Sequence, residues 1–399
     1  MFAQHGIALL LVPLSVCAGA VVSADFEGGS IGKISQVAPG HFRLGVIGET
    51  DQSGRNRQAS WYYFRIDNAP RTEMRFDLVD LPGEYNFQKN NGPLSDKTPP
   101  VISYDGKEWT HVTDLTYDPK EPKLQIRVVP TASRFWLAHT PPYTNEHLVR
   151  LRKEVNGHRG TKEEIIGKTP QSRPMYLWSI GNPAARKTVW LMFRQHSWES
   201  GSSWVGEGLI RTLLSDDALR SRILWKIIPM CDPDGVARGG VRFNHKGYDL
   251  NRNWDVEDPE SMPQITAQRK AIANWIGSGN KIDLFLSLHN TETSEYLEGP
   301  PAGDTNPAVK SLAERFFASL KENTSFDPSR PLFYAANTTT EGMKGRMTVI
   351  QGLHRDFKIP GFLMEQRIAF HRKLSHFPEI PDRLEFGRQL ARAIAESVE

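Results

Sequence analysis

The sequence predicts two domains, an all-β antiparallel sandwich over residues 25–140 and an α/β domain over residues 141–399. Two patterns predict this division: short runs of alternating apolar and polar residues fill the first part, and apolar runs separated by helical patterns fill the second. A length of 399 residues also exceeds the usual size of one domain. With 39% hydrophobic residues, including 19 Phe and 10 Trp, the chain can fill both cores, which excludes a disordered protein.

Alternation identifies the strands of the first domain. Apolar and polar residues alternate over 42–46, 74–78 and 124–128, so each strand has one buried and one solvated face. A turn sequence, Asp105-Gly106, marks a candidate hairpin. Short strands at this spacing are typical of an antiparallel sandwich.

The second domain combines continuous apolar runs with helical patterns. Continuous apolar character is typical of strands covered on both faces, so we expect a mixed, mostly parallel sheet with helices on both faces. Helices are expected over Ser261–Ile276, from Pro307 after the N-cap Asn306, and from Pro381 onward. The expected strands are Tyr176–Ile180, Val189–Phe193, Ile223–Ile228, Leu284–Leu288 and Gly361–Met364.

Residues 1–24 have the composition of a signal peptide. They contain no Lys, Arg, Asp or Glu, residues 7–16 are almost wholly apolar, and the segment ends at Ala24 in a small-residue pattern that suits signal peptidase. The apolar run is short for a membrane-spanning helix. We expect cleavage after Ala24, export to the periplasm or the exterior, and no membrane span in the mature chain. A valine before Cys17 disfavours a lipoprotein anchor.

Charge and cysteine content exclude further classes. The chain has 49 Lys and Arg against 46 Asp and Glu, a formal charge of +3, which supplies no basic face for nucleic acid. Two cysteines exclude a disulfide scaffold.

Polar residues directly follow three of the expected strands. His196 and Glu199 follow the second run, His289 the fourth and Glu365 the fifth. Because sites in open α/β sheets lie beyond the carboxyl ends of the strands, we expect these side chains to converge.

Two histidines and a glutamate form the donor set of a catalytic zinc site, since three protein ligands leave a fourth position for water. Zinc lowers the pKa of its water and polarises a carbonyl. We therefore expect one Zn²⁺ per chain, held by His196, Glu199 and His289. A further carboxylate, Glu365, would take the proton of the water and pass it to the leaving group.

Each of these residues has a simpler interpretation when taken alone. His196 and Glu199 could form a structural ion pair, His289 could be a core histidine, and Glu365 could be the buried partner of an arginine. Only their joint placement favours zinc. A second His-x-x-Glu sequence, at 376–379, has no strand before it and is bounded by prolines, so we expect a surface loop.

Two further features suit anion binding. Asn251 and Arg252 offer a planar fork of donors for a carboxylate, although Arg252 could instead pair with Asp249 or Asp255 in a structural loop. Arg242 could stabilise a developing oxyanion.

Together these residues resemble the M14 zinc carboxypeptidases, specifically the branch that includes the cytosolic carboxypeptidases. The resemblance covers nearly the whole chain after residue 24, with a sandwich like the N-terminal β-domain of that branch and a zinc carboxypeptidase-like domain behind it. The motifs that carry it are Arg194-Gln195-His196 with Glu199, Asp232-Pro233-Asp234-Gly235-Val236, Asp249-Leu250-Asn251-Arg252-Asn253 and Leu288-His289-Asn290.

The resemblance implies a role for each residue in the family reaction. His196, Glu199 and His289 would bind zinc. Glu365 would be the general base and Arg242 would polarise the scissile carbonyl. The terminal carboxylate of the substrate would be held by Asn251 and Arg252.

We therefore expect an exported zinc metallocarboxypeptidase that hydrolyses the C-terminal bond of a peptide or protein. A zinc deacylase of small N-acyl amino acids on the same fold stays open, as does a catalytically inactive binding protein. Lys344 and Arg346 would favour an acidic C-terminal residue if they line the pocket; otherwise they belong to a solvated basic loop. The natural substrate, the oligomeric state and the role of the sandwich do not follow from the sequence.

Overall fold

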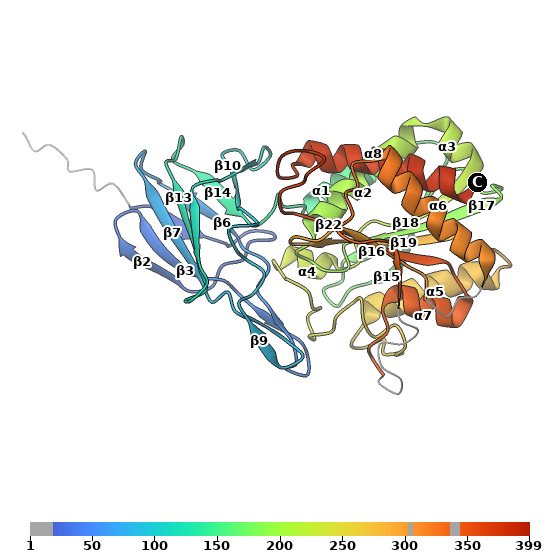
Figure 1. Cartoon of the computed structure of the whole chain (residues 1–399), viewed down its shortest axis with the longest axis horizontal. Coiled ribbons are helices and arrows are strands. Elements are labelled where there is room, and N and C mark those ends of the chain that lie inside the picture. Colours follow the sequence, from blue (N-terminus) through green and yellow to red (C-terminus); the bar gives the residue numbers. More distant parts are fainter. Residues whose placement is uncertain (1–18, 302–305, 336–343) are drawn as a thin grey trace, which may run out of the picture.

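Two domains lie side by side in the computed structural model, which describes residues 19–301, 306–335 and 344–399 (Figure 1). Strands of the first domain lie between Val21 and Ala138, and the second domain begins with helix α1 (Asn145–Asn156). The predicted fold class, a β-sandwich followed by a mixed α/β domain, is confirmed.

Two five-stranded sheets form the sandwich, in the orders β1-β6-β14-β10-β11 and β12-β13-β7-β3-β2. Every pair is antiparallel except β3–β7, which is parallel. Apolar residues of the alternating runs, such as Leu44, Phe76 and Ile126, are fully buried between the sheets. The strands are β1 (Val21–Ser23), β2 (Ile34–Ala38), β3 (His41–Gly45), β6 (Tyr63–Asp67), β7 (Met74–Val79), β10 (Val101–Ser103), β11 (Thr110–His111), β12 (Leu115–Asp118), β13 (Lys123–Val128) and β14 (Phe135–Ala138).

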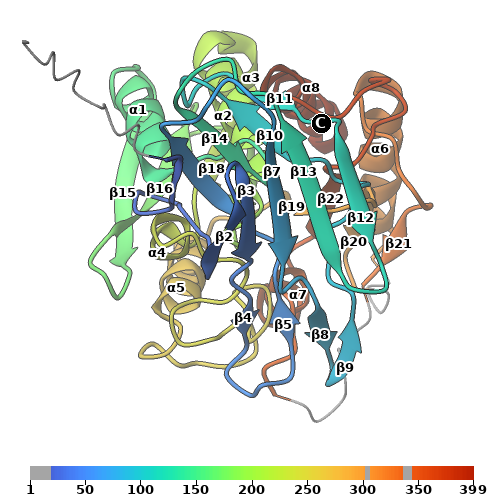
Figure 2. The same ribbon diagram turned by 90° about the vertical axis from the view of Figure 1, so that its left-hand side faces the viewer.

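A small four-stranded sheet extends from the sandwich as an arm beside the second domain (Figures 1 and 2). Its strands are β4 (Glu49–Thr50), β5 (Arg57–Gln58), β8 (Gly83–Tyr85) and β9 (Gln88–Asn90). The arm contacts the second domain directly, since Gln52 N donates to Gly247 O at 3.1 Å. No pattern in the sequence predicted it.

Strand β1 bears on the expected signal peptide. Residues 1–18, with Cys17, lie outside the described residues, but β1 pairs with β6 and the side chain of Val22 is buried between the sheets. Cleavage after Ala24 would remove this strand. A leader that leaves the sheet intact would end before Val21. Among the described residues, no helix is long and apolar enough to cross a membrane.

An eight-stranded sheet forms the middle of the second domain, in the order β15-β16-β18-β17-β19-β22-β20-β21. The central strands β18, β17, β19 and β22 are parallel, and all five expected strands are present. Antiparallel pairs occur only toward the edges, at β15–β16, β16–β18 and β20–β22. The strands are β15 (Thr161–Lys168), β16 (Pro174–Ile180), β17 (Lys187–Phe193), β18 (Ile223–Ile228), β19 (Leu284–Thr291), β20 (Tyr296–Gly299), β21 (Phe333–Tyr334) and β22 (Gly361–Arg367).

Helices cover both faces of this sheet, which explains the continuous apolar runs. In β19, Leu286 packs with residues of α2 and α8 on one face, and Phe285 packs with residues of α5 and α7 on the other. The helices are α2 (Ser200–Ser215), α3 (Asp217–Arg222), α4 (Pro233–Ala237), α5 (Pro263–Gly277), α6 (Pro307–Asn323), α7 (Val349–Phe357) and α8 (Ile380–Val398).

Candidate active site

Neighbouring strands bring the expected site residues to one edge of the sheet. Strand β19 lies between β17 and β22, and all three are parallel. His289 lies opposite Glu365 in the register of β19 and β22. His196 and Glu199 follow the end of β17 in a tight turn before α2.

A buried arginine shapes that turn. Arg194 has a φ of 61°, in the left-handed region, and is 2% exposed. Its Nε and Nη2 donate to the carbonyl of Ser197 at 2.9 and 2.6 Å, and its Nη1 donates to the carbonyl of Tyr143 at 3.2 Å. These bonds satisfy the carbonyl of Ser197 in the turn and that of Tyr143 just before α1. The turn therefore presents His196 and Glu199 on the same side.

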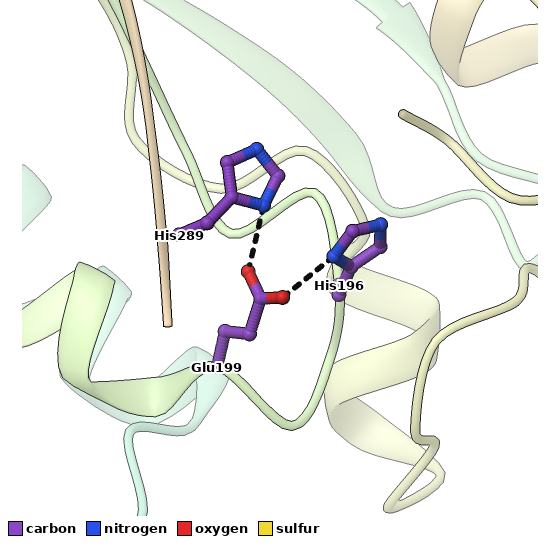
Figure 3. Close-up of side chains that lie close together, drawn as sticks. All are labelled: His196, Glu199 and His289. Carbon is purple, nitrogen blue, oxygen red and sulfur yellow. Dashed lines mark hydrogen bonds and ion pairs between the residues drawn. The ribbon is translucent and has the colours of Figure 1, made fainter. Parts of the chain in front are cut away.

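His196, Glu199 and His289 form one buried cluster (Figure 3). The Nδ1 atom of His196 lies 2.6 Å from Glu199 Oε1, and the Nδ1 atom of His289 lies 2.9 Å from Glu199 Oε2. The candidate ligand atoms all lie within 4.8 Å of one another. The three side chains that the sequence placed together are therefore together in the fold.

Outer hydrogen bonds fix both imidazole rings so that Nδ1 faces the cluster. His196 Nε2 lies 3.0 Å from Asp249 Oδ1. His289 Nε2 lies 2.9 Å from Ser287 Oγ and 3.0 Å from Gln195 Oε1. Such partners hold the tautomer and the orientation of metal-binding histidines. The sequence analysis missed these roles of Asp249, Ser287 and Gln195.

The charge of the cluster suits a cation. Burial raises the pKa of Glu199, but His196 and His289 lower it more strongly, to about 2, so the carboxylate stays ionised. Two imidazole nitrogens and one carboxylate are the donor set of a catalytic zinc site. The residues present therefore fit a zinc ion.

Glu365 has a free carboxylate oxygen beside this cluster. Its Oε2 is buried and has no hydrogen-bond partner in the described part of the chain. Burial and the negative charge of Glu199 raise the pKa of Glu365 well above its ordinary value. Glu365 forms no direct ion pair with an arginine of the described segments, although the charge of Arg242 acts on its carboxyl and lowers its pKa. Tyr296, which the sequence analysis missed, lies opposite Glu365 in the register of β20 and β22.

Arg242 lies on the loop after α4 and reaches the same centre. Its Nε donates to Asp249 Oδ2 at 2.7 Å. Burial lowers the pKa of its guanidinium, but the negative charges of Asp249, Glu199 and Glu365 outweigh burial and raise it. A permanent cation therefore lies beside the candidate ligands and the candidate base.

Asn251 and Arg252 follow Asp249 in a loop whose contacts leave donors available. The side-chain oxygen of Asn251 accepts the N–H of Val349 at 3.0 Å, which leaves its amide nitrogen as a donor. Arg252 Nη1 donates to the Asn251 carbonyl at 2.8 Å.

The alternative of a structural ion pair for Arg252 is wrong. Asp249 binds Arg242 and His196, and Asp255 accepts the N–H of Gly345 at 2.9 Å. Within residues 19–301, 306–335 and 344–399, no carboxylate forms an ion pair with Arg252.

The second His-x-x-Glu sequence lies apart from the site. Residues 376–379 form a loop between β22 and α8, and the side chains of His376 and Glu379 are exposed. The expected surface loop is confirmed.

One family model matches the sandwich domain, and a second matches the part of the α/β domain that contains the His196, Glu199 and His289 cluster. The model described as zinc carboxypeptidase matches residues 158–344, and the model described as cytosolic carboxypeptidase N-terminal domain matches residues 22–139. The chain belongs to the M14 zinc carboxypeptidase family. This M14 chain also carries the N-terminal domain of the cytosolic carboxypeptidases. The family is one of metallocarboxypeptidases, so the alternatives of a deacylase and of an inactive binding protein are not favoured.

Similar proteins cover this M14 chain to different extents. An uncharacterised protein of Zymomonas mobilis is 23% identical, over 95% of this chain and 96% of its own length. Cytosolic carboxypeptidase 3 of mouse is 27% identical over 69% of this chain but only 30% of its own length. Cytosolic carboxypeptidase 2 of human is 29% identical over 68% of this chain and 34% of its own. The chain thus spans about a third of these two carboxypeptidases.

Solved structures share the fold of both domains. A metallo-carboxypeptidase from Burkholderia cenocepacia has a TM-score of 0.81 at 22% identity, covering 96% of this chain and 99% of its own. A metallo-carboxypeptidase from Pseudomonas aeruginosa, in complex with (2-guanidinoethylmercapto)succinic acid, has a TM-score of 0.80 at 22% identity, covering 95% of this chain and 100% of its own.

Proposed function

We propose that the protein is a zinc metallocarboxypeptidase that removes the C-terminal residue of a peptide or protein. The observation that carries this proposal is the buried cluster of His196, Glu199 and His289, with Glu365 one strand away in register with His289. Family membership supports it. One zinc ion per chain would be held by the three clustered residues.

The residues of the chain then have separate tasks. A zinc ion held by His196, Glu199 and His289 would polarise a carbonyl as a Lewis acid and would lower the pKa of a water. Glu365 takes a proton from the attacking water and passes it to the leaving amine. Arg242 donates to the oxygen that becomes negative in the transition state. Asn251 and Arg252 bind the terminal carboxylate, which selects the last peptide bond.

We also propose a preference for an acidic C-terminal residue, supported by a group of cations near Arg346. Arg346 forms no hydrogen bond or ion pair with another described residue. Burial and the charges of Arg252 and Arg55 lower the pKa of Arg346, against the charge of Asp249, so Arg252 of the second domain and Arg55 of the sandwich both lie close enough to repel Arg346. An acidic side chain beside the terminal carboxylate would relieve this repulsion. Lys344 is exposed and adds to the same charge.

A panel of synthetic peptides tests both proposals. The peptides share one sequence and end in Glu, Leu or Lys, and each is made with a free and with an amidated C-terminus. We expect release of the last residue from free ends only. Glu should exceed Lys about 10–100-fold in kcat/KM, because a hydrogen bond to a charged group contributes about 1.5–3 kcal/mol. Mass spectrometry of the products gives the rates.

Each arm of the panel has its own contrary outcome. Cleavage of amidated peptides would exclude the carboxypeptidase assignment. N-acetylated amino acids are assayed beside the panel, and their hydrolysis without any peptide cleavage would favour the deacylase. A clear preference for Leu or Lys would leave the peptidase standing and reject the acidic preference.

We propose further that the protein is exported. The support is the apolar, uncharged composition of the first residues. Because β1 belongs to the sandwich, cleavage after Ala20, at the small-residue sequence Ala18-Gly19-Ala20, would keep the fold intact where cleavage after Ala24 would not.

A further inference from the structure

Glu49, a residue of the sandwich domain in β4, binds the loop that carries Arg242 with both of its oxygens. Oε2 accepts the backbone N–H of Arg242 at 2.7 Å and that of Phe243 at 3.0 Å. Oε1 accepts from Arg238 Nη2 at 2.9 Å. The Glu49 side chain is 17% exposed, so these charge-assisted bonds are largely shielded from solvent.

The contacts of this loop continue to the metal cluster. Arg242 Nε donates to Asp249 Oδ2 at 2.7 Å, and Asp249 Oδ1 lies 3.0 Å from His196 Nε2. The carbonyl of Val241, the residue before Arg242, accepts the N–H of Trp198 at 3.0 Å. Trp198 directly precedes the candidate ligand Glu199. The carboxylate of Glu49 therefore fixes the backbone from which the Arg242 side chain reaches the site.

The loop has little regular structure of its own. It begins after α4 with Gly239, whose φ is +66°, and Gly240, and it forms a single isolated bridge between Phe243 and Asp249. The position of Arg242 thus depends on contacts from outside the loop, and those to the backbone N–H groups of Arg242 and Phe243 come from Glu49 of the sandwich domain.

We propose that Glu49 is a positioning residue for Arg242, through which the sandwich domain completes the active site of the second domain. This proposal rests on the proposed function, in which Arg242 donates to the developing oxyanion. Glu49 affects the transition state indirectly, because it fixes Arg242, which donates to the developing oxyanion. A displacement of about 1 Å in such a group costs about 10²-fold in rate.

Comparison of Glu49→Gln with Glu27→Gln tests the proposal in the full chain. Glu27 is a matched control because it is also a half-buried glutamate of the sandwich that binds the second domain, accepting from Asn145 N at 2.9 Å and from Asn145 Nδ2 at 2.7 Å. We expect kcat of Glu49→Gln to fall about tenfold or more, with KM close to wild type because Asn251 and Arg252 are untouched. Glu27→Gln should keep the wild-type kcat. Equal losses in both variants would overturn the proposal.

A double variant separates positioning from a general loss of stability. If Glu49 acts through Arg242, Glu49→Gln combined with Arg242→Ala should be no slower than Arg242→Ala alone. Multiplied losses in the double variant would overturn the proposal.

Amide hydrogen exchange gives an outcome that does not depend on turnover. We expect faster exchange over residues 238–247 in Glu49→Gln and unchanged exchange there in Glu27→Gln. Unchanged exchange in both would overturn the positioning role. Faster exchange in a protein whose wild type cleaves no peptide would instead reject the proposed function and leave the positioning of the loop intact.

Discussion

Replacing Glu365 with glutamine is expected to lower kcat about 10²–10⁴-fold, the usual contribution of a general base, while the bound zinc is retained. Glutamine keeps the size of the side chain but cannot take a proton from water. His196, Glu199 and His289 are unchanged, so elemental analysis should find as much zinc as in the wild type. Steady-state kinetics on a free C-terminal peptide measures the loss.

Glu207→Gln is the matched control for this experiment. Glu207 is also a buried glutamate whose pKa is raised by burial, but it lies in α2 beside Tyr143 and Arg211. We expect Glu207→Gln to keep its activity. A Glu365→Gln variant that turns over at the wild-type rate with zinc bound would reject the assigned role.

The same substitution, which lowers activity, is expected not to lower the stability of the metal-free protein at alkaline pH. Because the folded pKa of Glu365 is raised, its contribution to folding is full at acidic pH and is lost as the pH rises. At pH 8 the carboxyl of an unfolded chain is ionised, so folding of the metal-free wild type must either bury that charge or protonate the group, and the amide requires neither. The free energy of unfolding of the metal-free wild type, measured in urea, should be no higher than that of metal-free Glu365→Gln.

The ligand set could be predicted from the sequence because strand ends are local features. An apolar run followed at once by His289 or Glu365 identifies both the strand and the edge where it ends. Parallel pairing of β19 and β22 then makes these two residues neighbours without any further information.

The extent of helix α2 could not be predicted from the sequence, because the composition of this segment is unusual for a helix. It contains Gly201, Gly206 and Gly208, which lower helix propensity, and it is buried almost all around. The glycines serve close packing: a Cβ on Gly208 would lie 2.1 Å from the Leu384 carbonyl of α8, and one on Gly387 would lie 2.1 Å from the Val205 carbonyl. Tertiary contact with α8 therefore outweighs local preference.

The outer contacts of the site escaped prediction for a different reason. Asp249 was visible in its motif, but by spacing it was a candidate partner of Arg252, as was Asp255. Only the fold gives Asp249 its actual partners, His196 and Arg242. The contact of Glu49 with Arg242 joins residues 193 positions apart and in different domains. No local pattern encodes such a contact.

Loss of one imidazole is expected to remove both zinc and activity. In His289→Ala, Glu199 keeps a single histidine partner and the donor set falls to two residues, below the three that catalytic zinc sites use. We expect zinc content well below that of the wild type and a loss of at least about 10³-fold in kcat/KM, since the metal contributes several kcal/mol to the transition state. Chelation of the wild-type protein should give the same loss, reversed by added zinc.

His376→Ala is the natural control for that loss, because His376 belongs to the second His-x-x-Glu sequence and lies on the surface. It should keep both zinc and activity, which would show that position at the sheet edge, and not the short motif, determines the site. Zinc retained in His289→Ala would mean that the ion is held elsewhere. The proposed mechanism, which needs zinc at His196, Glu199 and His289, would then be rejected, although the fold would still be that of the family.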